Sequence, residues 1–268
     1  MLIEFALYLL LGSFVGTLAG LLGVGGGLII VPFLVAIFSA QGIEADIIMH
    51  LALGTSLASI LATSISSVYA HQKQGAVIWN YAFKLTPGIL IGAWCGALFA
   101  SVLNSDILKP VFAVFELLVA VYMLWGIKAR QQQNSPSLIN HGFSGSVIGF
   151  ISSLVGIGGG TMSVPWLMWH GSSIHKAIAT SAALGFPIAL SGSLSYLING
   201  MNYPGLPNYA LGFVYLPALV GIIISSVFFA PVGARLAHSL DVEKLKKVFA
   251  LLLIALASYL LASTPQVI

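Results

Sequence analysis

Residues 12–32 read GSFVGTLAGLLGVGGGLIIVP, and residues 145–165 read GSVIGFISSLVGIGGGTMSVP. Aligned without a gap, the two stretches lie 133 residues apart and match at ten of twenty-one positions. Each sets a glycine-rich break between two apolar runs, with a proline five residues after the last glycine. Paired, glycine-interrupted hydrophobic segments in corresponding halves of a chain indicate the substrate site of a membrane transporter.

The composition places the whole chain in a lipid bilayer. Of the 268 residues, 59% are hydrophobic and only 6% are charged, whereas soluble domains carry roughly 25% charged residues. The apolar runs are continuous rather than alternating, which predicts an all-α integral membrane protein. The net charge of +3 comes from loop lysines, so nucleic acid is not expected as a partner. A single cysteine, Cys95, can build neither a disulfide nor a thiolate metal site, and no cofactor is expected.

About ten hydrophobic segments are expected along the chain. Most reach the roughly 20 residues that a spanning helix needs. The two that follow the glycine breaks are short, and whether they span fully or re-enter stays open. The expected segments are 2–22, 27–39, 48–70, 80–103, 107–127, 138–155, 160–170, 174–198, 209–232 and 245–262.

The lysines and arginines indicate how many segments cross the membrane. If all ten segments cross, nine basic residues fall on one side and only Lys109 falls on the other. If each glycine-broken pair makes one crossing, four of the ten basic residues fall on one side of the membrane and six fall on the other. The positive-inside rule therefore favours ten crossings with both termini outside. The nine residues expected on the cytoplasmic side are Lys73, Lys84, Lys128, Arg130, Lys176, Arg235, Lys244, Lys246 and Lys247.

Five crossings per half is an odd number, which predicts two inverted repeats. We expect a first membrane half at 1–127, a polar cytoplasmic linker at 128–140 and a second membrane half at 141–268. The repeats continue beyond the breaks, because the stretch from His50 to Ser56 resembles the stretch from His175 to Ser181.

The glycine breaks are the first candidate site. Glycine lets the backbone leave helical geometry and allows a ligand to approach closely. The helix that follows offers free N–H groups and a positive dipole end, for which an anion is the natural partner. Hydroxyl groups on the next long segment can donate to an oxyanion without carrying charge. The residues expected to bind substrate are Gly25, Gly26, Gly27, Thr55, Ser56, Gly158, Gly159, Gly160, Thr161, Thr180 and Ser181.

Each of these features also has a purely structural interpretation. Glycines permit tight turns and close packing, and serine or threonine in a membrane helix often bonds its own backbone. The stripes at Gly12, Gly16 and Gly20 and at Gly88, Gly92 and Gly96 are typical of close helix packing.

Three ionisable residues are candidates for carrying a coupling proton. Glu116 lies near the middle of an apolar segment, where a carboxylate is costly and indicates a function. His50 and His175 are duplicated but lie at segment ends, where solvated or capping roles are common. No metal site is expected, because His170 and His175 have no carboxylate or cysteine nearby.

The doubled GxGGGxxxxP break, the two (G/A)TS motifs and HQKQGAVIWN at 71–80 resemble the TauE/SafE family of sulfite and organosulfonate exporters. The resemblance covers essentially the whole chain. It implies a secondary transporter that moves a small sulfur-containing anion such as sulfite, sulfoacetate or thiosulfate across the bacterial cytoplasmic membrane, usually outward. Two departures stand out: Ile78 replaces an acidic residue common in the family, and Thr161 stands where the first repeat has Leu28.

Other functions remain open at this point. An anion channel of the same fold, or a transporter of a non-sulfur anion, fits the same residues. An intramembrane enzyme would need paired acids, a serine–histidine set or a metal motif, and none is visible. A membrane scaffold is disfavoured because no sizeable soluble loop is present. Beyond the glycine stripes nothing marks the interface of a homodimer.

Overall fold

The structure is a computed structural model that describes residues 2–22, 26–125, 138–236 and 242–262. The described residues form ten helices and one short hairpin, so the all-α prediction is confirmed. The helices are α1 (Leu2–Leu22), α2 (Gly27–Ala40), α3 (Ala45–Gln72), α4 (Trp79–Val102), α5 (Ser105–Trp125), α6 (Leu138–Leu154), α7 (Gly160–Trp169), α8 (Ile174–Gly200), α9 (Leu216–Leu236) and α10 (Val242–Ala262), and the hairpin pairs β1 (Ala210–Leu211) with β2 (Val214–Tyr215).

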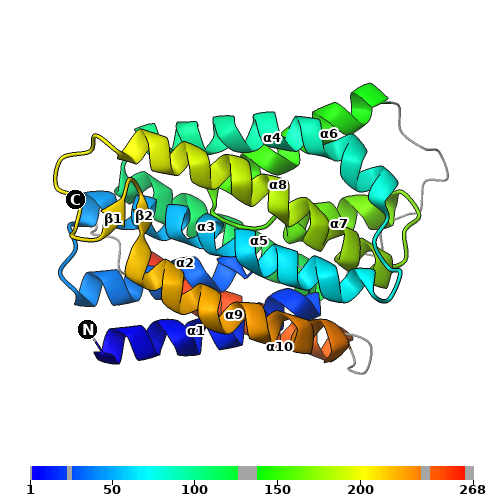
Figure 1. The fold of residues 1–268 in the computed structure, drawn as a ribbon, viewed down its shortest axis with the longest axis horizontal. Coiled ribbons are helices and arrows are strands. Elements are labelled where there is room, and N and C mark those ends of the chain that lie inside the picture. The colour runs from blue at the N-terminus through cyan, green and yellow to red at the C-terminus, as the bar shows by residue number, and fades with distance from the viewer. Residues whose placement is uncertain (1, 23–25, 126–137, 237–241, 263–268) are drawn as a thin grey trace.

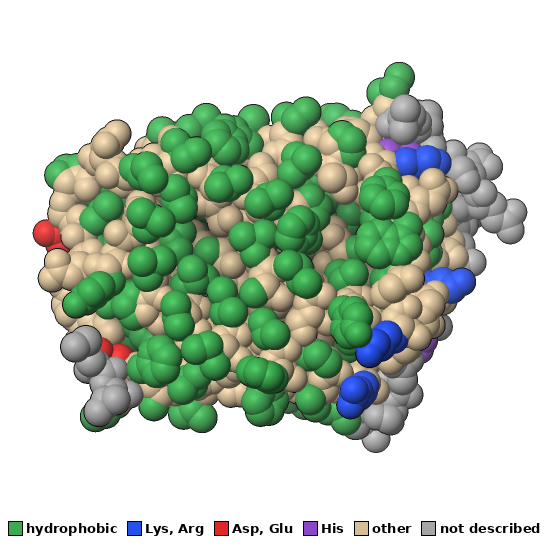
Figure 2. Space-filling view, viewed as in Figure 1, with side chains coloured by type: hydrophobic (Ala, Val, Ile, Leu, Met, Phe, Trp, Pro, Cys, Tyr) green, Lys and Arg blue, Asp and Glu red, His purple; other side chains and the backbone are tan. Residues whose placement is uncertain are grey.

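The helices run roughly along the long axis of the molecule, and α3 and α8 form its centre (Figure 1). Six described helices are long and apolar enough to cross a membrane, namely α1, α3, α4, α5, α8 and α9. In the spanning windows of α3 and α8, 89% and 83% of the residues are buried, against 33% to 44% in the other four. Hydrophobic side chains cover the visible flank of the molecule (Figure 2). An apolar exterior of this kind fits lipid as the surrounding solvent.

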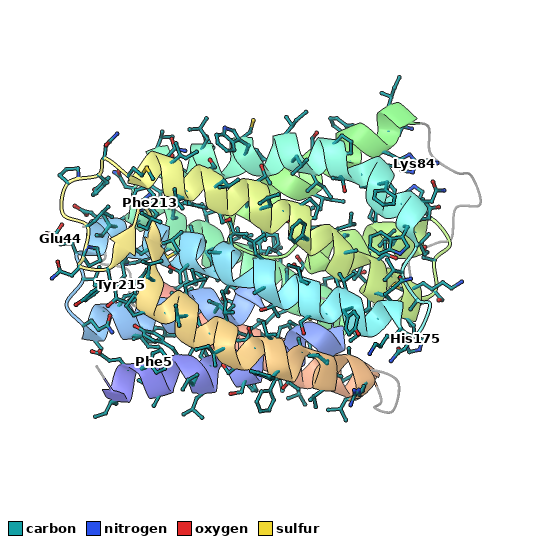
Figure 3. The ribbon with its side chains drawn as sticks, viewed as in Figure 1. Phe5, Glu44, Lys84, His175, Phe213 and Tyr215 are labelled. Atoms are coloured by element: carbon teal, nitrogen blue, oxygen red, sulfur yellow. The ribbon has the colours of Figure 1, made fainter. Side chains whose placement is uncertain are left out.

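The two ends of the molecule differ in charge. Glu44 lies at one end, and Lys84 and His175 lie at the other (Figure 3). Lysine and arginine side chains gather at the second end, and acidic side chains are seen at the first (Figure 2). We call these the acidic end and the lysine-rich end. The chain begins α1 and finishes α10 at the acidic end (Figure 1), as any even number of crossings requires, and the count of ten stays a prediction.

Each glycine-broken pair of helices forms a hairpin. The first, α1–α2, starts at the acidic end and returns there, whereas the second, α6–α7, starts and returns at the lysine-rich end (Figure 1). The short helices α2 and α7 therefore behave as half-helices that point toward the middle of the molecule.

The glycine stripes of α1 and α4 are packing seams. A Cβ at Gly16 would lie 2.7 Å from the Cα of Ser226 on α9, and a Cβ at Gly92 would lie 2.8 Å from the Cα of Ser146 on α6. Because real Cβ atoms almost never approach below 3.0 Å, only glycine allows these pairs of helices to lie so close. The predicted packing role of both stripes is confirmed.

Corresponding residues of the two halves make corresponding contacts. The hydroxyl of Ser66 donates to Val227 O at 2.7 Å, and that of Ser191 donates to Leu90 O at 2.6 Å. Ser191 of α8 follows Ser66 of α3 by 125 residues, and Val227 of α9 follows Leu90 of α4 by 137 residues. With these two offsets, each contact is the counterpart of the other. A second matched pair of contacts joins the long helices to the helices before the breaks, namely His71 Nε2 with Gly20 O at 3.3 Å and Tyr196 OH with Ser153 O at 3.3 Å. The inverted relation of the halves stays a prediction, and these contacts support it.

Two expected boundaries shift. The segment expected at 209–232 begins as a helix only at Leu216, because residues 210–215 form the β1–β2 hairpin with Gly212 in the left-handed region. The helix α6 already begins at Leu138, inside the expected linker 128–140, most of which lies outside the described residues.

Candidate substrate site

The two glycine breaks have the same backbone geometry. Gly26 and Gly159 precede α2 and α7 with φ of 76° and 78°, in the left-handed region that L side chains rarely adopt. The carbonyl of Gly26 accepts hydrogen bonds from the N–H groups of Ile29 and Ile30, and that of Gly159 accepts bonds from the corresponding residues of α7. The duplicated sequence thus produces a duplicated turn. Gly25, also expected in the site, lies outside the described residues.

The two breaks meet in the middle of the molecule. A Cβ on Gly27 would lie 2.8 Å from the Cα of Ile157 and closer still to the carbonyl oxygen of Gly156. Ser56 on α3 donates its hydroxyl to the same Gly156 oxygen at 2.7 Å. The sequence predicted that the glycines and Ser56 belong to one site, and the structure brings them together.

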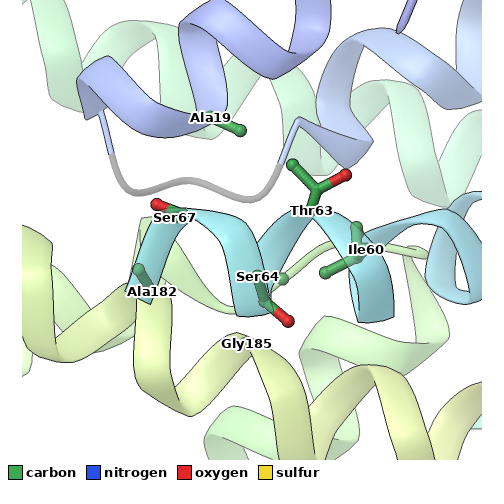
Figure 4. Close-up of a pocket in the computed structure, with 8 residues that line it drawn as sticks. Ala19, Ile60, Thr63, Ser64, Ser67, Ala182 and Gly185 are labelled. Carbon is green, nitrogen blue, oxygen red and sulfur yellow. The ribbon is translucent and has the colours of Figure 1, made fainter. Parts of the chain in front are cut away.

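A small pocket lies beside the second break, between α1, α3 and α8 (Figure 4). On α3 and α8 its residues stand in the half of each helix nearer the lysine-rich end. No charged side chain is among the residues that line it, which are Ala19, Ile60, Thr63, Ser64, Ser67, Gly158, Ala182 and Gly185.

Most hydroxyls of this pocket have partners within the protein, but one does not. Thr63 contacts the hydroxyl of Ser226 at 2.9 Å, and Ser64 donates to a carbonyl of its own helix at 3.0 Å. The hydroxyl of Ser67 is buried and has no hydrogen-bond partner among the described residues. A buried hydroxyl without a partner costs about 1–3 kcal/mol, so Ser67 is the natural donor for a ligand in the pocket.

The start of α7 adds further donors next to Gly158. Gly160 and Thr161 occupy the first turn, and no backbone acceptor within the described residues takes their N–H groups. The hydroxyl of Thr161 is also buried without a described partner, whereas the first repeat has the apolar and fully buried Leu28. Among the described residues, the second break therefore has a free hydroxyl at a position where the first has an apolar side chain.

The two threonines of the predicted site have a structural task. Thr55 accepts a hydrogen bond from the N–H of Tyr215 at 2.9 Å, and Thr180 accepts one from the N–H of Ile78 at 2.9 Å. These N–H groups immediately precede α9 and α4, so each threonine caps a helix of the other half. Neither threonine lines the pocket. Ser181, beside Thr180, accepts a bond from Ser163 of α7 at 2.8 Å and holds α7 to α8.

The candidate proton carriers lie elsewhere. Glu116 is fully buried in α5, and neither carboxylate oxygen has a hydrogen-bond partner in the described part of the chain. His50 contacts Leu103 O at 2.9 Å and packs against the ring of Phe213, and His175 is exposed at the lysine-rich end. None of the three lines the pocket, so their role in proton coupling stays a prediction. Across the described ranges no three His, Cys, Asp or Glu residues are placed to hold a metal ion.

Sequence reasoning missed the hydroxyls that line the pocket, Thr63, Ser64 and Ser67. A signal was present, because residues 55–67 read TSLASILATSISS, an unusually hydroxyl-rich run for an apolar helix. Their role depends on which side of α3 faces the second break, and only the structure supplies that.

Two half-helices that enter from opposite ends and meet beside an uncharged pocket with several hydroxyls are typical of a membrane transporter. A family model described as "Sulfite exporter TauE/SafE" matches residues 8–260, and the chain belongs to this family.

Curated relatives carry the same class of name. A "Probable membrane transporter protein" of Haemophilus influenzae is 40% identical over 253 residues, covering 94% of this chain and 96% of its own length. One from Methanocaldococcus jannaschii is 29% identical over 248 residues, covering 90% and 89%. YunE of Bacillus subtilis is 30% identical over 221 residues, covering 74% and 80%. No solved structure matches. The protein is a multi-pass membrane transporter.

Proposed function

We propose that the protein moves a small sulfur oxyanion, such as sulfite or an organosulfonate, through the pocket beside the second glycine break. The observation that carries this proposal is a set of uncharged donors: the Ser67 hydroxyl in the pocket, and the N–H groups of Gly160 and Thr161, which follow the lining residue Gly158 in the chain and have no backbone acceptor among the described residues. The description of the family as sulfite exporters supports the choice of cargo.

The donors favour an anion over a cation. The polar side chains that line the pocket are all hydroxyls, and the start of α7 carries the positive end of the helix dipole. A carboxylate that would attract a cation is absent from the lining residues. Uncharged donors also bind more weakly than arginine or lysine, which lets the ligand leave again.

The orientation that the positive-inside rule predicts supports export. The lysine-rich end then faces the cytoplasm, and the pocket lies toward that end. An anion entering from the cytoplasm leaves down the membrane potential, which is worth about 2.3 kcal/mol per charge per 100 mV. Proton coupling is not required for export under this potential.

The test is uptake of labelled sulfite into proteoliposomes that contain purified protein, against a panel of competing anions and with or without a pH gradient. We expect saturable uptake that organosulfonates compete for, and loss of uptake in Gly159→Leu, whose side chain would collide with Ile188. Protein-free liposomes provide the background. Absence of uptake for every sulfur oxyanion would overturn the cargo, and a non-saturable conductance would make the protein a channel instead.

A further inference from the structure

The pocket has a counterpart on the other side of the breaks that is closed. The matched contacts of the two halves show which residue of one half corresponds to each pocket residue of the other. Corresponding residues of α1 and α6 are 133 positions apart in the sequence, and those of α3 and α8 are 125 positions apart. The positions that correspond to Ala182, Thr63 and Ser67 lie in the halves of α3 and α8 nearer the acidic end, and the position that corresponds to Ala19 lies on α6. They are Ser152 for Ala19, Leu57 for Ala182, Ile188 for Thr63 and Gly192 for Ser67.

Larger aliphatic side chains fill this counterpart. Leu57 stands where the pocket has Ala182, and its Cδ1 lies 2.8 Å from the place that a Cβ of Gly192 would take. Ile188 stands where the pocket has Thr63, and its Cδ1 sits against Gly159 of the second break. Both side chains are 0% exposed. The counterpart is therefore filled because leucine and isoleucine stand where the pocket has alanine and threonine.

A second layer toward the acidic end differs in the same direction. Phe213 occupies the position that corresponds to Ala76. The N–H of Phe213 donates to Tyr196 O at 3.3 Å, and the N–H of Ala76 donates to His71 O, the matched residue of the other central helix, also at 3.3 Å. Phe213 is 2% exposed and lies at this end of the molecule (Figure 3). Its ring packs on Gly200, because a Cβ added to Gly200 would lie 2.8 Å from the Cγ of Phe213. The acidic end is closed by a phenyl ring where the lysine-rich end has a methyl group.

The closed counterpart nevertheless retains a free donor. Ser152 is fully buried next to Gly159, its Oγ lying 3.4 Å from the Cβ position of that glycine. Its hydroxyl has no hydrogen-bond partner among the described residues. A purely structural core position would not need an unpartnered hydroxyl, which costs about as much as the one at Ser67.

We propose that Ser152 belongs to a second half-site for the same anion, reached from the acidic end, and that Leu57 and Ile188 form the gate that closes it in this conformation. The inference rests on the proposed function, because the ligand is the anion of the first pocket. When the gate side chains move off Gly192 and Gly159, the anion passes from the donors around Ser67 to the hydroxyl of Ser152 and leaves toward the acidic end.

Cysteine labelling tests the gate without any cargo. In a Cys95→Ser background, Ser152→Cys is exposed to a membrane-impermeant methanethiosulfonate reagent in vesicles of both orientations. We expect slow labelling, accelerated about tenfold or more by Leu57→Ala and only from the acidic end. Ser67→Cys, labelled from the lysine-rich end without a gate mutation, identifies the two orientations.

A matched control separates gating from loose packing. Leu51→Ala removes an equally buried leucine of α3 that, unlike Leu57, is not among the side chains nearest to the Cβ position of Gly192. The gate would be overturned if Ser152→Cys were labelled no faster with Leu57→Ala than with Leu51→Ala. It would also be overturned if the reagent reached this cysteine from the lysine-rich end. Ile188→Ala provides a second gate variant should Leu57→Ala elute as an aggregate.

The ligand is tested separately from the gate. Sulfite added to the Leu57→Ala protein should slow labelling of Ser152→Cys, because the anion occupies the half-site. Fast labelling from the acidic end without protection by sulfite would overturn the anion assignment, and with it the proposed cargo, while the gate would stand. Slow labelling together with normal sulfite uptake would overturn the gate and leave the proposed function intact.

Discussion

Substitution of Gly27 by alanine tests whether the contact between the two breaks matters for transport. The added Cβ would lie 2.8 Å from Ile157 Cα, whereas ordinary van der Waals contact begins at 3.4 Å. The obstructing atoms are backbone, and the Gly156 oxygen lies closer still, so the two hairpins must separate by more than 0.6 Å, the difference between these two distances. Overpacking of this kind costs about 1–3 kcal/mol. Because the separation falls at the proposed anion site, we expect sulfite uptake to drop by about tenfold or more.

The control for this prediction is Gly42→Ala. Gly42 has φ of 74° in the loop between α2 and α3, and a Cβ there would meet nothing within 4 Å. The left-handed backbone alone costs an L residue about 1–2 kcal/mol, a loss of stability similar to that of Gly27→Ala. Thermal unfolding in detergent should show both variants destabilised, while proteoliposome uptake falls only in Gly27→Ala. Uptake by Gly27→Ala within about twofold of wild type would refute the reasoning.

Three further substitutions probe other parts of the account. Ser67→Ala should raise the half-saturation concentration for sulfite about 3- to 10-fold, the worth of one neutral hydrogen bond, whereas Ser66→Ala, which loses its bond to α9, should leave that concentration unchanged. Thr180→Val leaves the N–H of Ile78 without its acceptor and should lower the free energy of unfolding by about 1–3 kcal/mol, measured by thermal unfolding. Glu116→Leu replaces a buried carboxyl that has no partner among the described residues, and should raise that free energy by about 1–3 kcal/mol; an unchanged or lower value would show that the carboxyl has a stabilising role.

The duplicated sequence predicted the backbone of the site well. Gly26 and Gly159 occupy equivalent left-handed positions because only glycine fits there, and this requirement leaves a visible mark in the sequence. The stripes from Gly12 and Gly88 predicted close packing for the same reason, since a backbone in contact excludes a Cβ. Constraints that act on a single residue type can be predicted from one sequence.

The side chains of the site could be predicted only in part. Thr55 and Thr180 are duplicated because both cap helices of the opposite half, a structural demand that the sequence cannot distinguish from ligand binding. Ser67 stands among several hydroxyls of α3, and which of them lacks a partner depends on how α3 faces α1 and α8. The hairpin before α9 was missed because residues 209–215 contain no charged residue and run directly into the apolar helix that follows.

Exchange across the membrane tests the central claim most directly, namely that an anion binds the pocket beside the second break and is carried across. Proteoliposomes are loaded with unlabelled sulfite, and the initial uptake of labelled sulfite is compared with that of empty vesicles. We predict that internal sulfite accelerates uptake, and that Ser67→Ala needs a higher external concentration to reach the same rate. Uptake that is indifferent to internal sulfite and to the Ser67 hydroxyl would contradict the account.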